Sequence, residues 1–348
     1  MTVRRCRLYS AASILSGVLL AALALSPAVR AQAPAPPGGG FDLPVDCRMG
    51  AVCSVQNYID HDPGPGWRDH TCGPLSYDGH RGIDIRVPTQ IEMRQGVAVL
   101  AAADGKVVAV NDGQPDLLLM DTGPGKTLDE RNGNWAAIDH GGGWVTTYAH
   151  MMKGTVTVKR GQQVKRGEKL GLIGLSGNSD FPHVHFAVTY RNLLLDPFIG
   201  MEPSAACGES GASLWSPAAQ TALAYRAGGL LSAGFLGRQP THREIMDGIV
   251  PPETVSATDP VLIFWTGAWG LRDGDRLRLA IFDPQGEVFV KNEHVMDRNR
   301  ATESRLIGRK RRGEPWPPGI YRGIYRVERQ VEGTTVVIID SVTEVEVR

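Results

Sequence analysis

The sequence predicts a mainly β protein, in which an antiparallel β-sheet domain is followed by a short helical connector and a small C-terminal β-sandwich. Between Gly96 and Val188, short β-branched and apolar stretches are separated by glycines at close spacing, which is typical of antiparallel strands joined by turns. Strand-like stretches return between Val261 and Val347, and little helical periodicity competes with them. The length of 348 residues, against about 150 for a typical domain, also indicates two domains.

The N-terminus predicts a secretory signal peptide over residues 1–31. Three arginines precede the apolar run 11–25, and small residues suited to signal peptidase follow it. The alternative, an uncleaved anchor, is disfavoured because the apolar run is shorter than the roughly 20 residues that a bilayer requires. We therefore expect a periplasmic or secreted protein, with no stable membrane insertion after cleavage. Residues 32–44 are rich in proline and glycine and are expected to form a flexible lead-in.

The cysteines predict two disulfides. Export leaves Cys47, Cys53, Cys72 and Cys207, an even number in a compartment where disulfides persist. Sequence alone allows three connectivities. We favour Cys47 with Cys53, and Cys72 with Cys207. Free buried cysteines remain an alternative, and a cysteine metal site is disfavoured because no C-x-x-C pair is present.

The strands of the first domain, expected over residues 45–207, follow one another closely. They are predicted at Ala98–Ala101, Lys106–Val110, Trp135–Asp139, Trp144–His150, Gln163–Val164, Lys169–Ile173 and His183–Thr189. The connector over residues 208–255 has the alanine and leucine content of one or two helices between Pro217 and Gly234. The sandwich is expected over residues 256–348, and its role is not predicted.

Three segments of the first domain carry histidines with spacing suited to a metal. His80 and Asp84 lie four residues apart with Gly82 between them, so the chain can bend round one ion, and imidazole with carboxylate is a normal ligand set for zinc. His183 and His185 alternate along a predicted strand, so both point to one face. His150 ends the segment Thr147–His150.

Taken together, these residues predict a catalytic zinc site. Three protein ligands leave one tetrahedral position open, and zinc makes a bound water acidic enough to ionise near neutral pH. Two further histidines would supply a general base and a donor to the developing oxyanion.

The motifs resemble those of the LytM or lysostaphin-type zinc peptidases, the M23 family. His80-Arg81-Gly82-Ile83-Asp84 is similar to the family's HxGxD element, and the resemblance continues through Ala103–Val107, Ile138–Gly141, Thr147–Met151, Gly161–Gly177 and Pro182–Phe186. It covers roughly Cys72 to Asp196 and says nothing about the C-terminal block. The resemblance implies a LytM-type catalytic domain, with Zn²⁺ on His80, Asp84 and His185 and with His150 and His183 as catalytic residues.

The same resemblance implies an endopeptidase that hydrolyses peptide bonds in peptidoglycan stem peptides or cross-links, with peptidoglycan as its partner. The alternative is a catalytically silent or latent LytM-type regulator or cell-wall-binding protein. Degenerate members of the family have lost ligands, so the complete set here favours catalysis. The insertion Asp112–Gly133 affects the expected substrate fit. A net charge of zero gives no indication of nucleic acid binding, and the oligomeric state is not predicted.

The remaining candidate site residues have simpler interpretations. His140 lies in a predicted turn and is expected to be structural, and Tyr148 fits either the cleft or the core. His61, His70, His242 and His294 have no partner at ligand spacing and are expected at the surface. The basic run Arg309–Arg312 is expected to be a solvated hairpin tip, with contact to an anionic polymer or lipid headgroups as the alternative.

Overall fold

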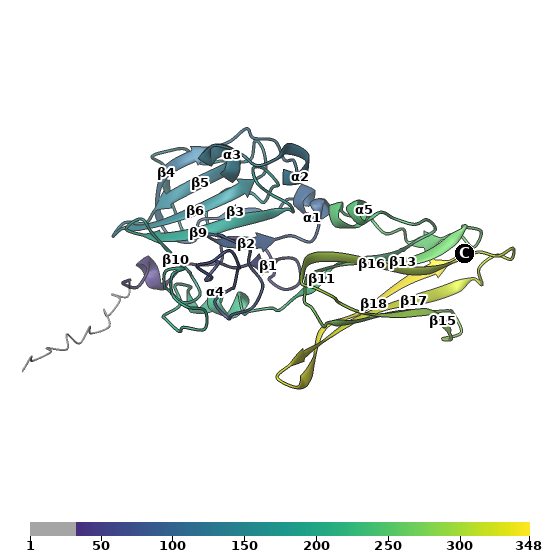
Figure 1. Ribbon diagram of the computed structural model, residues 1–348. Helices are drawn as coiled ribbons and strands as arrows, with labels where there is room; N and C mark the ends of the chain where they lie inside the picture. The colour runs from purple at the N-terminus through teal and green to yellow at the C-terminus, as the bar shows by residue number, and fades with distance from the viewer. Residues whose placement is uncertain (1–32) are drawn as a thin grey trace, which may run out of the picture. The chain divides into compact units, whose positions relative to one another are not determined.

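The computed structural model describes residues 33–348, so the predicted signal peptide lies outside the described residues. An eight-stranded antiparallel sheet forms the first part of the fold (Figure 1). Its path is β1 (Ser54–Asn57), β2 (Ile83–Arg86), β9 (His183–Tyr190), β6 (Trp144–Met151), β5 (Asn134–Asp139), β4 (Gly105–Asn111) and β7 (Gln163–Val164), with β10 (Leu193–Leu195) paired to β9. A separate pair, β3 (Ala98–Leu100) and β8 (Lys169–Leu172), completes this part.

The helices are short and lie in the connections. They are η1 (Pro37–Gly39), α1 (Gln90–Gln95), α2 (Leu119–Thr122), α3 (Leu128–Asn132), α4 (Pro217–Ala222) and α5 (His242–Asp247). Helices α2 and α3 lie within the insertion Asp112–Gly133, and Thr127 caps α3 by a reciprocal capping box with Glu130. None of the helices in the described part of the chain has the length and apolar content needed to cross a bilayer.

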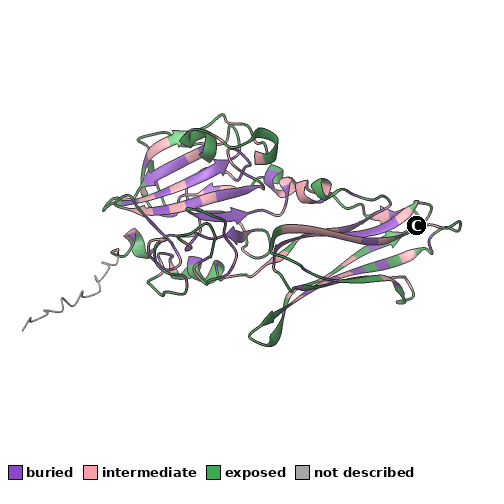
Figure 2. Ribbon diagram, in the orientation of Figure 1, coloured by how far each residue is buried: buried purple, intermediate pink, exposed green. Residues whose placement is uncertain are grey.

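The C-terminal part consists of two sheets. One is β11 (Gly229–Leu236), β13 (Val261–Leu271) and β16 (Arg300–Lys310), and the other is β12 (Thr254–Val255), β18 (Thr334–Val347), β17 (Gly319–Val331), β14 (Arg276–Phe282) and β15 (Val288–Val295). Strands β12 and β18 are parallel and the other pairs are antiparallel. Buried positions alternate with exposed or half-buried ones along β14 and β17, whereas β13 is buried along almost its whole length (Figure 2). Buried side chains such as Phe264, Leu279 and Tyr325 form one apolar cluster from both sheets.

The predicted fold class is confirmed, because the chain is mainly β with antiparallel sheets in both parts. The helical prediction for 217–234 is only partly right. Helix α4 ends at Ala222, and β11 begins at Gly229, directly after Gly228. The leucines and alanines of this segment pack as a strand because β13 pairs with it, with Phe235 opposite Phe264. The favoured disulfides, Cys47–Cys53 and Cys72–Cys207, are both formed.

Candidate metal centre and active site

Strands β2 and β9 bring the predicted ligands together. The two strands are antiparallel neighbours whose register places Asp84 directly opposite His185. His80 lies in the loop that leads into β2. Its Nε2 is 3.1 Å from Asp84 Oδ1 and 3.2 Å from His185 Nδ1, and the His185 Nδ1 to Asp84 Oδ1 distance is 2.9 Å. Three donors from two segments about a hundred residues apart in the sequence therefore converge on one point.

This arrangement fits a zinc ion. Zinc bonds of about 2.0–2.1 Å in tetrahedral geometry set neighbouring donor atoms about 3.3 Å apart. The observed separations are close to that value, and two nitrogens with one carboxylate oxygen are ordinary zinc donors. The side chains of His80 and Asp84 are almost completely buried, whereas that of His185 is 18% exposed. The site therefore has a closed side and an open side, as a catalytic metal site requires.

Two groups that sequence reasoning missed orient these ligands. The Asn57 side-chain amide donates to Asp84 Oδ2 at 2.9 Å, which leaves Oδ1 for a metal. The Tyr58 carbonyl oxygen lies 2.7 Å from His80 Nδ1 and so holds the proton on that nitrogen, leaving Nε2 as the donor atom. No sequence pattern indicates which backbone carbonyl a histidine will contact. Asn57 could not be found from spacing either, because it lies 27 residues from Asp84.

Gly82 makes the close approach of the ligands possible. A Cβ atom at this position would clash with the His185 imidazole and stand 2.8 Å from the Phe186 carbonyl oxygen. The glycine in the His80–Asp84 segment is therefore required by sterics, since β2 passes directly beside the third ligand.

The two predicted catalytic histidines lie beside the ligands, each fixed by a carbonyl. His150 Nδ1 is 2.8 Å from the Ser176 carbonyl oxygen, and His183 Nδ1 is 2.7 Å from that of Phe181. In the His150 ring the proton is therefore held on Nδ1, and Nε2 is left as an acceptor. His183 Nε2 is 3.4 Å from Asp84 Oδ1, and the ring centroids of His150 and His183 are 4.7 Å apart.

His150 is held in an unusual state. Its φ is +62°, a left-handed conformation that a residue with a side chain adopts only when the surrounding structure enforces it. Burial, together with the nearby His183 and His185 rings, holds its pKa well below the usual range for histidine. The imidazole is therefore neutral at pH 7 and able to accept a proton.

The insertion Asp112–Gly133 is bonded to the loop that carries these carbonyls. The Leu119 amide donates to the Ser179 carbonyl oxygen at 2.8 Å, and the Gly125 amide donates to Asn178 Oδ1 at 2.8 Å. A cavity of about 300 Å³ lies between the insertion and Gly177, the residue next to Ser176. The insertion is therefore bonded to the loop whose carbonyls hold the two predicted catalytic histidines.

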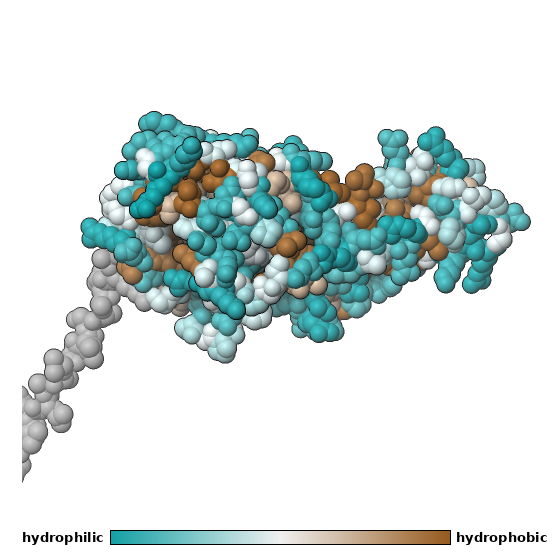
Figure 3. Space-filling view, turned by 90° about the horizontal axis from the view of Figure 1, so that it is seen from above, coloured by the Kyte–Doolittle hydropathy of each residue, from teal (hydrophilic) through white to brown (hydrophobic). Residues whose placement is uncertain are grey.

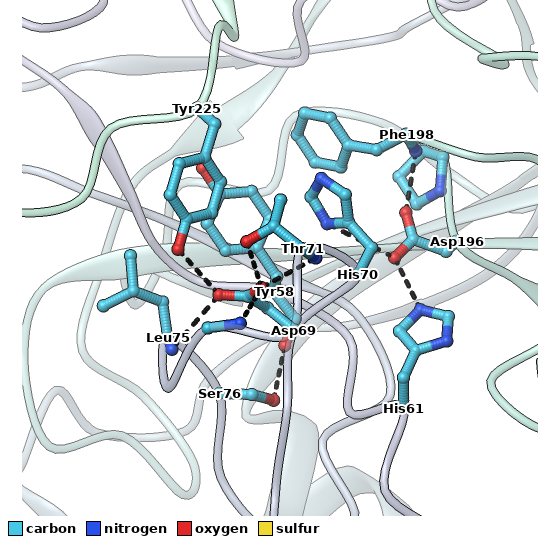
Figure 4. Close-up of polar contacts among 12 residues, drawn as sticks. Tyr58, His61, Asp69, His70, Thr71, Leu75, Ser76, Asp196, Phe198 and Tyr225 are labelled. Carbon is cyan, nitrogen blue, oxygen red and sulfur yellow. Dashed lines mark hydrogen bonds and ion pairs between the residues drawn. The ribbon is translucent and has the colours of Figure 1, made fainter. Parts of the chain in front are cut away.

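The surface prediction is wrong for His61. Its side chain is buried, with Nε2 2.9 Å from Asp196 Oδ2 and Nδ1 3.1 Å from the Ala205 carbonyl oxygen. His70 is largely buried and stacks on Phe198, at 4.9 Å between ring centroids (Figure 4). The partner carboxylate Asp196 lies 135 residues from His61, so local spacing has no means of revealing it.

Two other residues take structural places. His140 bonds the Asp104 carbonyl oxygen at 2.8 Å and Thr146 Oγ1 at 2.7 Å, away from the ligand group. Tyr148 is a core residue, because its ring is fully buried and its hydroxyl accepts from the Ala102 amide at 2.8 Å.

The segment that carries this geometry is similar in sequence to a known protein family. Residues 78–197 match the model described as Peptidase family M23. The chain is similar to the cell division protein DipM of Caulobacter vibrioides (32% identical over 123 residues) and to the peptidoglycan DD-endopeptidase ShyB of Vibrio cholerae (33% over 117 residues). These matches span 35% and 34% of this chain but 16% and 22% of the two relatives.

Among solved structures, a zinc containing peptidase from Vibrio cholerae is 27% identical, with a TM-score of 0.32, over 48% of this chain and 40% of that chain. The matched segment 78–197 contains all five predicted site residues: His80, Asp84, His150, His183 and His185. In residues 78–197, the chain carries a domain of peptidase family M23.

Proposed function

We propose that this protein is a zinc-dependent endopeptidase that hydrolyses peptide bonds in bacterial peptidoglycan outside the cytoplasm. The observation that carries the proposal is the convergence of His80, Asp84 and His185 within hydrogen-bond distance, with His150 and His183 beside them. The two disulfides support an extracytoplasmic location, and the name of the relative ShyB supports the substrate.

The residues divide the chemistry between them. His80, Asp84 and His185 would hold zinc, which would supply Lewis acidity toward water and the scissile carbonyl. His150, neutral and buried, accepts a proton at Nε2 from the attacking water. His183, whose Nε2 lies 3.4 Å from the Asp84 carboxylate, would donate a hydrogen bond to the oxygen on which negative charge develops. Asn57 and the Tyr58 carbonyl keep the ligand atoms in place.

The test is zinc content together with the release of free amines from purified cross-linked peptidoglycan. The wild-type chain should hold about one zinc per chain and release amines. The His150→Ala variant should retain the metal and lose at least about a hundredfold in rate, because general-base catalysis contributes on that order. The Asp84→Ala variant should lose the metal as well.

The competing reading is a silent or latent regulator or wall-binding protein of the same family. It predicts zinc in the wild-type chain with no amine release from any of the three proteins. A wild-type chain without zinc would contradict the ligand assignment itself.

A further inference from the structure

The C-terminal sandwich carries a cleft between the open edges of its two sheets. Strand β16 is the edge of the three-stranded sheet and β15 is the edge of the five-stranded sheet. A cleft of about 370 Å³ lies between them. Apolar side chains from both sheets line it, including Ile263, Val290 and Ile307, while the side-chain amides of Gln239 and Asn292 add polar groups.

Cations surround this cleft without carboxylate partners. Lys291, Arg309 and Lys310 line it, and no ion pair is formed by any of the three within residues 33–348. Arg309 lies over the Phe289 ring at 4.8 Å, which fixes the guanidinium near the edge of the sheet. Arg311 and Arg312 continue the basic run, and Glu314 is the one carboxylate in the segment 308–318.

The rest of the sandwich has a different pattern. Nine of its other arginines form ion pairs with aspartate or glutamate: 276, 278, 298, 300, 305, 322, 326, 329 and 348. Most arginines elsewhere in the sandwich therefore have a carboxylate neighbour. Lys291, Arg309 and Lys310 form no such pair in the described part of the chain, and their local positive charge attracts an anion.

The shape of the site favours a chain molecule over a membrane surface. The apolar residues of the cleft are buried or half-buried, whereas a membrane-binding surface presents exposed apolar side chains. On the face shown in Figure 3, hydrophilic residues cover most of the part at the right, with apolar residues between them. A ligand that enters a recess and carries both carboxylates and small apolar groups matches these features.

We infer that the β15–β16 cleft binds peptidoglycan strands through the carboxylates of their stem peptides, separately from the M23 active site. The choice of polymer rests on the proposed function. Lys291, Arg309 and Lys310 form charge-assisted hydrogen bonds with the carboxylates, and the apolar lining takes the alanine and acetyl methyl groups. The sandwich thereby raises the concentration of the peptidase on its insoluble substrate.

The test is cosedimentation of the full chain with purified insoluble peptidoglycan, in a His150→Ala background so that the polymer stays intact. The change Lys291→Glu with Lys310→Glu should weaken binding about tenfold at low salt, since two charge-assisted contacts become repulsive. The matched control is Lys159→Glu with Arg160→Glu, two exposed cations of the catalytic domain that give the same change in net charge. The control should bind as the parent does.

Three results would overturn the inference. They are no sedimentation of the parent, binding by the Lys291→Glu, Lys310→Glu variant that equals the parent's, or an equal loss of binding in this variant and in the control. Binding to phosphatidylglycerol vesicles with the same dependence on Lys291 and Lys310, and no binding to peptidoglycan, would assign the cleft to lipid instead. Unchanged thermal unfolding checks that the variants fold. A separate assay measures hydrolysis of a small soluble cross-linked fragment by protein that retains His150. It tests the proposed active site alone, so its failure is distinct from a failure of the cleft to bind the polymer. The rate should be the same in the Lys291→Glu, Lys310→Glu variant.

Discussion

Gly82 is the position at which the metal site has no room for a side chain. The change Gly82→Ala places a methyl group against the His185 ring and the Phe186 carbonyl oxygen, so β2 and β9 must separate or the ring must rotate. We expect zinc affinity to fall about a hundredfold, the upper end of the effect of misplacing groups that orient ligands. Competition with a chelator measures this, and the exposed Gly64→Ala variant is the control. Wild-type affinity in Gly82→Ala would contradict the steric argument.

His61 makes stability depend on pH. Burial lowers the pKa of this ring, but the hydrogen bond and the charge of Asp196 outweigh burial and raise its pKa above the usual value. Both ring nitrogens face acceptors, so the protonated form is the one that the fold binds. A raised folded-state pKa contributes stability that is fully present below about pH 6.5 and is lost as the pH rises through the folded value.

The His61→Gln variant tests this dependence. At pH 6 we expect it to unfold with a free energy about 3 kcal/mol below wild type, because Asp196 loses its buried charged partner. The difference should narrow at pH 8.5. Urea unfolding at both pH values measures it, and a constant difference would show that His61 is neutral in the fold.

The proximity of the five proposed site residues could be predicted because each is a side chain in a short motif with its own spacing, and their roles stay a prediction. The groups that hold them could not. The carbonyls of Tyr58, Ser176 and Phe181 are common to every residue type, and only the folded loops place them under the imidazoles. His61 was misplaced at the surface for the same reason, since its partner comes from beyond β10.

Among the elements, the insertion Asp112–Gly133 is bonded through one carboxylate to the segments around the predicted catalytic histidines. Asp116 Oδ2 accepts from the Lys153 amide and Oδ1 from the Leu175 amide, each at 3.0 Å. These amides lie just after His150 and just before Ser176, whose carbonyl holds the His150 ring. Asp116 is therefore a positioning residue.

We expect Asp116→Ala to lower kcat/KM about tenfold with zinc content unchanged, because two hydrogen bonds to a charged acceptor are lost. Asp112→Ala is the matched control. Its carboxylate accepts from the Gly154 amide at 2.8 Å, farther along the chain from His150. If both variants lose activity equally, the effect is a general loosening of the insertion rather than positioning of the histidine.

The strands between Ala98 and Tyr190 were predicted more reliably than the connector, because glycines and β-branched residues mark them locally, whereas no strand was predicted over β16. Strand β11 was missed because its leucine and alanine content is equally suited to a helix, and pairing with β13 decides between them. Which sheet each C-terminal strand joins is likewise fixed by partners distant in the sequence, such as β16 on β13.

In the molecule as a whole, the Cys72–Cys207 disulfide ties the loop before His80 to the segment that follows β10. Near Cys72, the Asp69 carboxylate accepts from Thr71, Gly73 and Tyr225, so the same loop is also bonded to the start of the connector (Figure 4). The bridge joins residues 135 apart, whereas Cys47–Cys53 joins residues 6 apart.

The two bridges should therefore differ in their effect on stability. Loop-closure entropy gives roughly 5 kcal/mol for the long bridge and roughly 2 kcal/mol for the short one at 25 °C. We expect Cys72→Ser with Cys207→Ser to lower the free energy of unfolding by more than Cys47→Ser with Cys53→Ser does, as measured by urea denaturation of zinc-free protein. Zinc-free protein is used because bound metal adds its own stabilisation to the folded state. Equal losses of unfolding free energy would contradict the loop-closure argument. They would mean that the hydrogen bonds around Asp69 persist in the unfolded chain, so that the Cys72–Cys207 bridge restricts the unfolded chain little further.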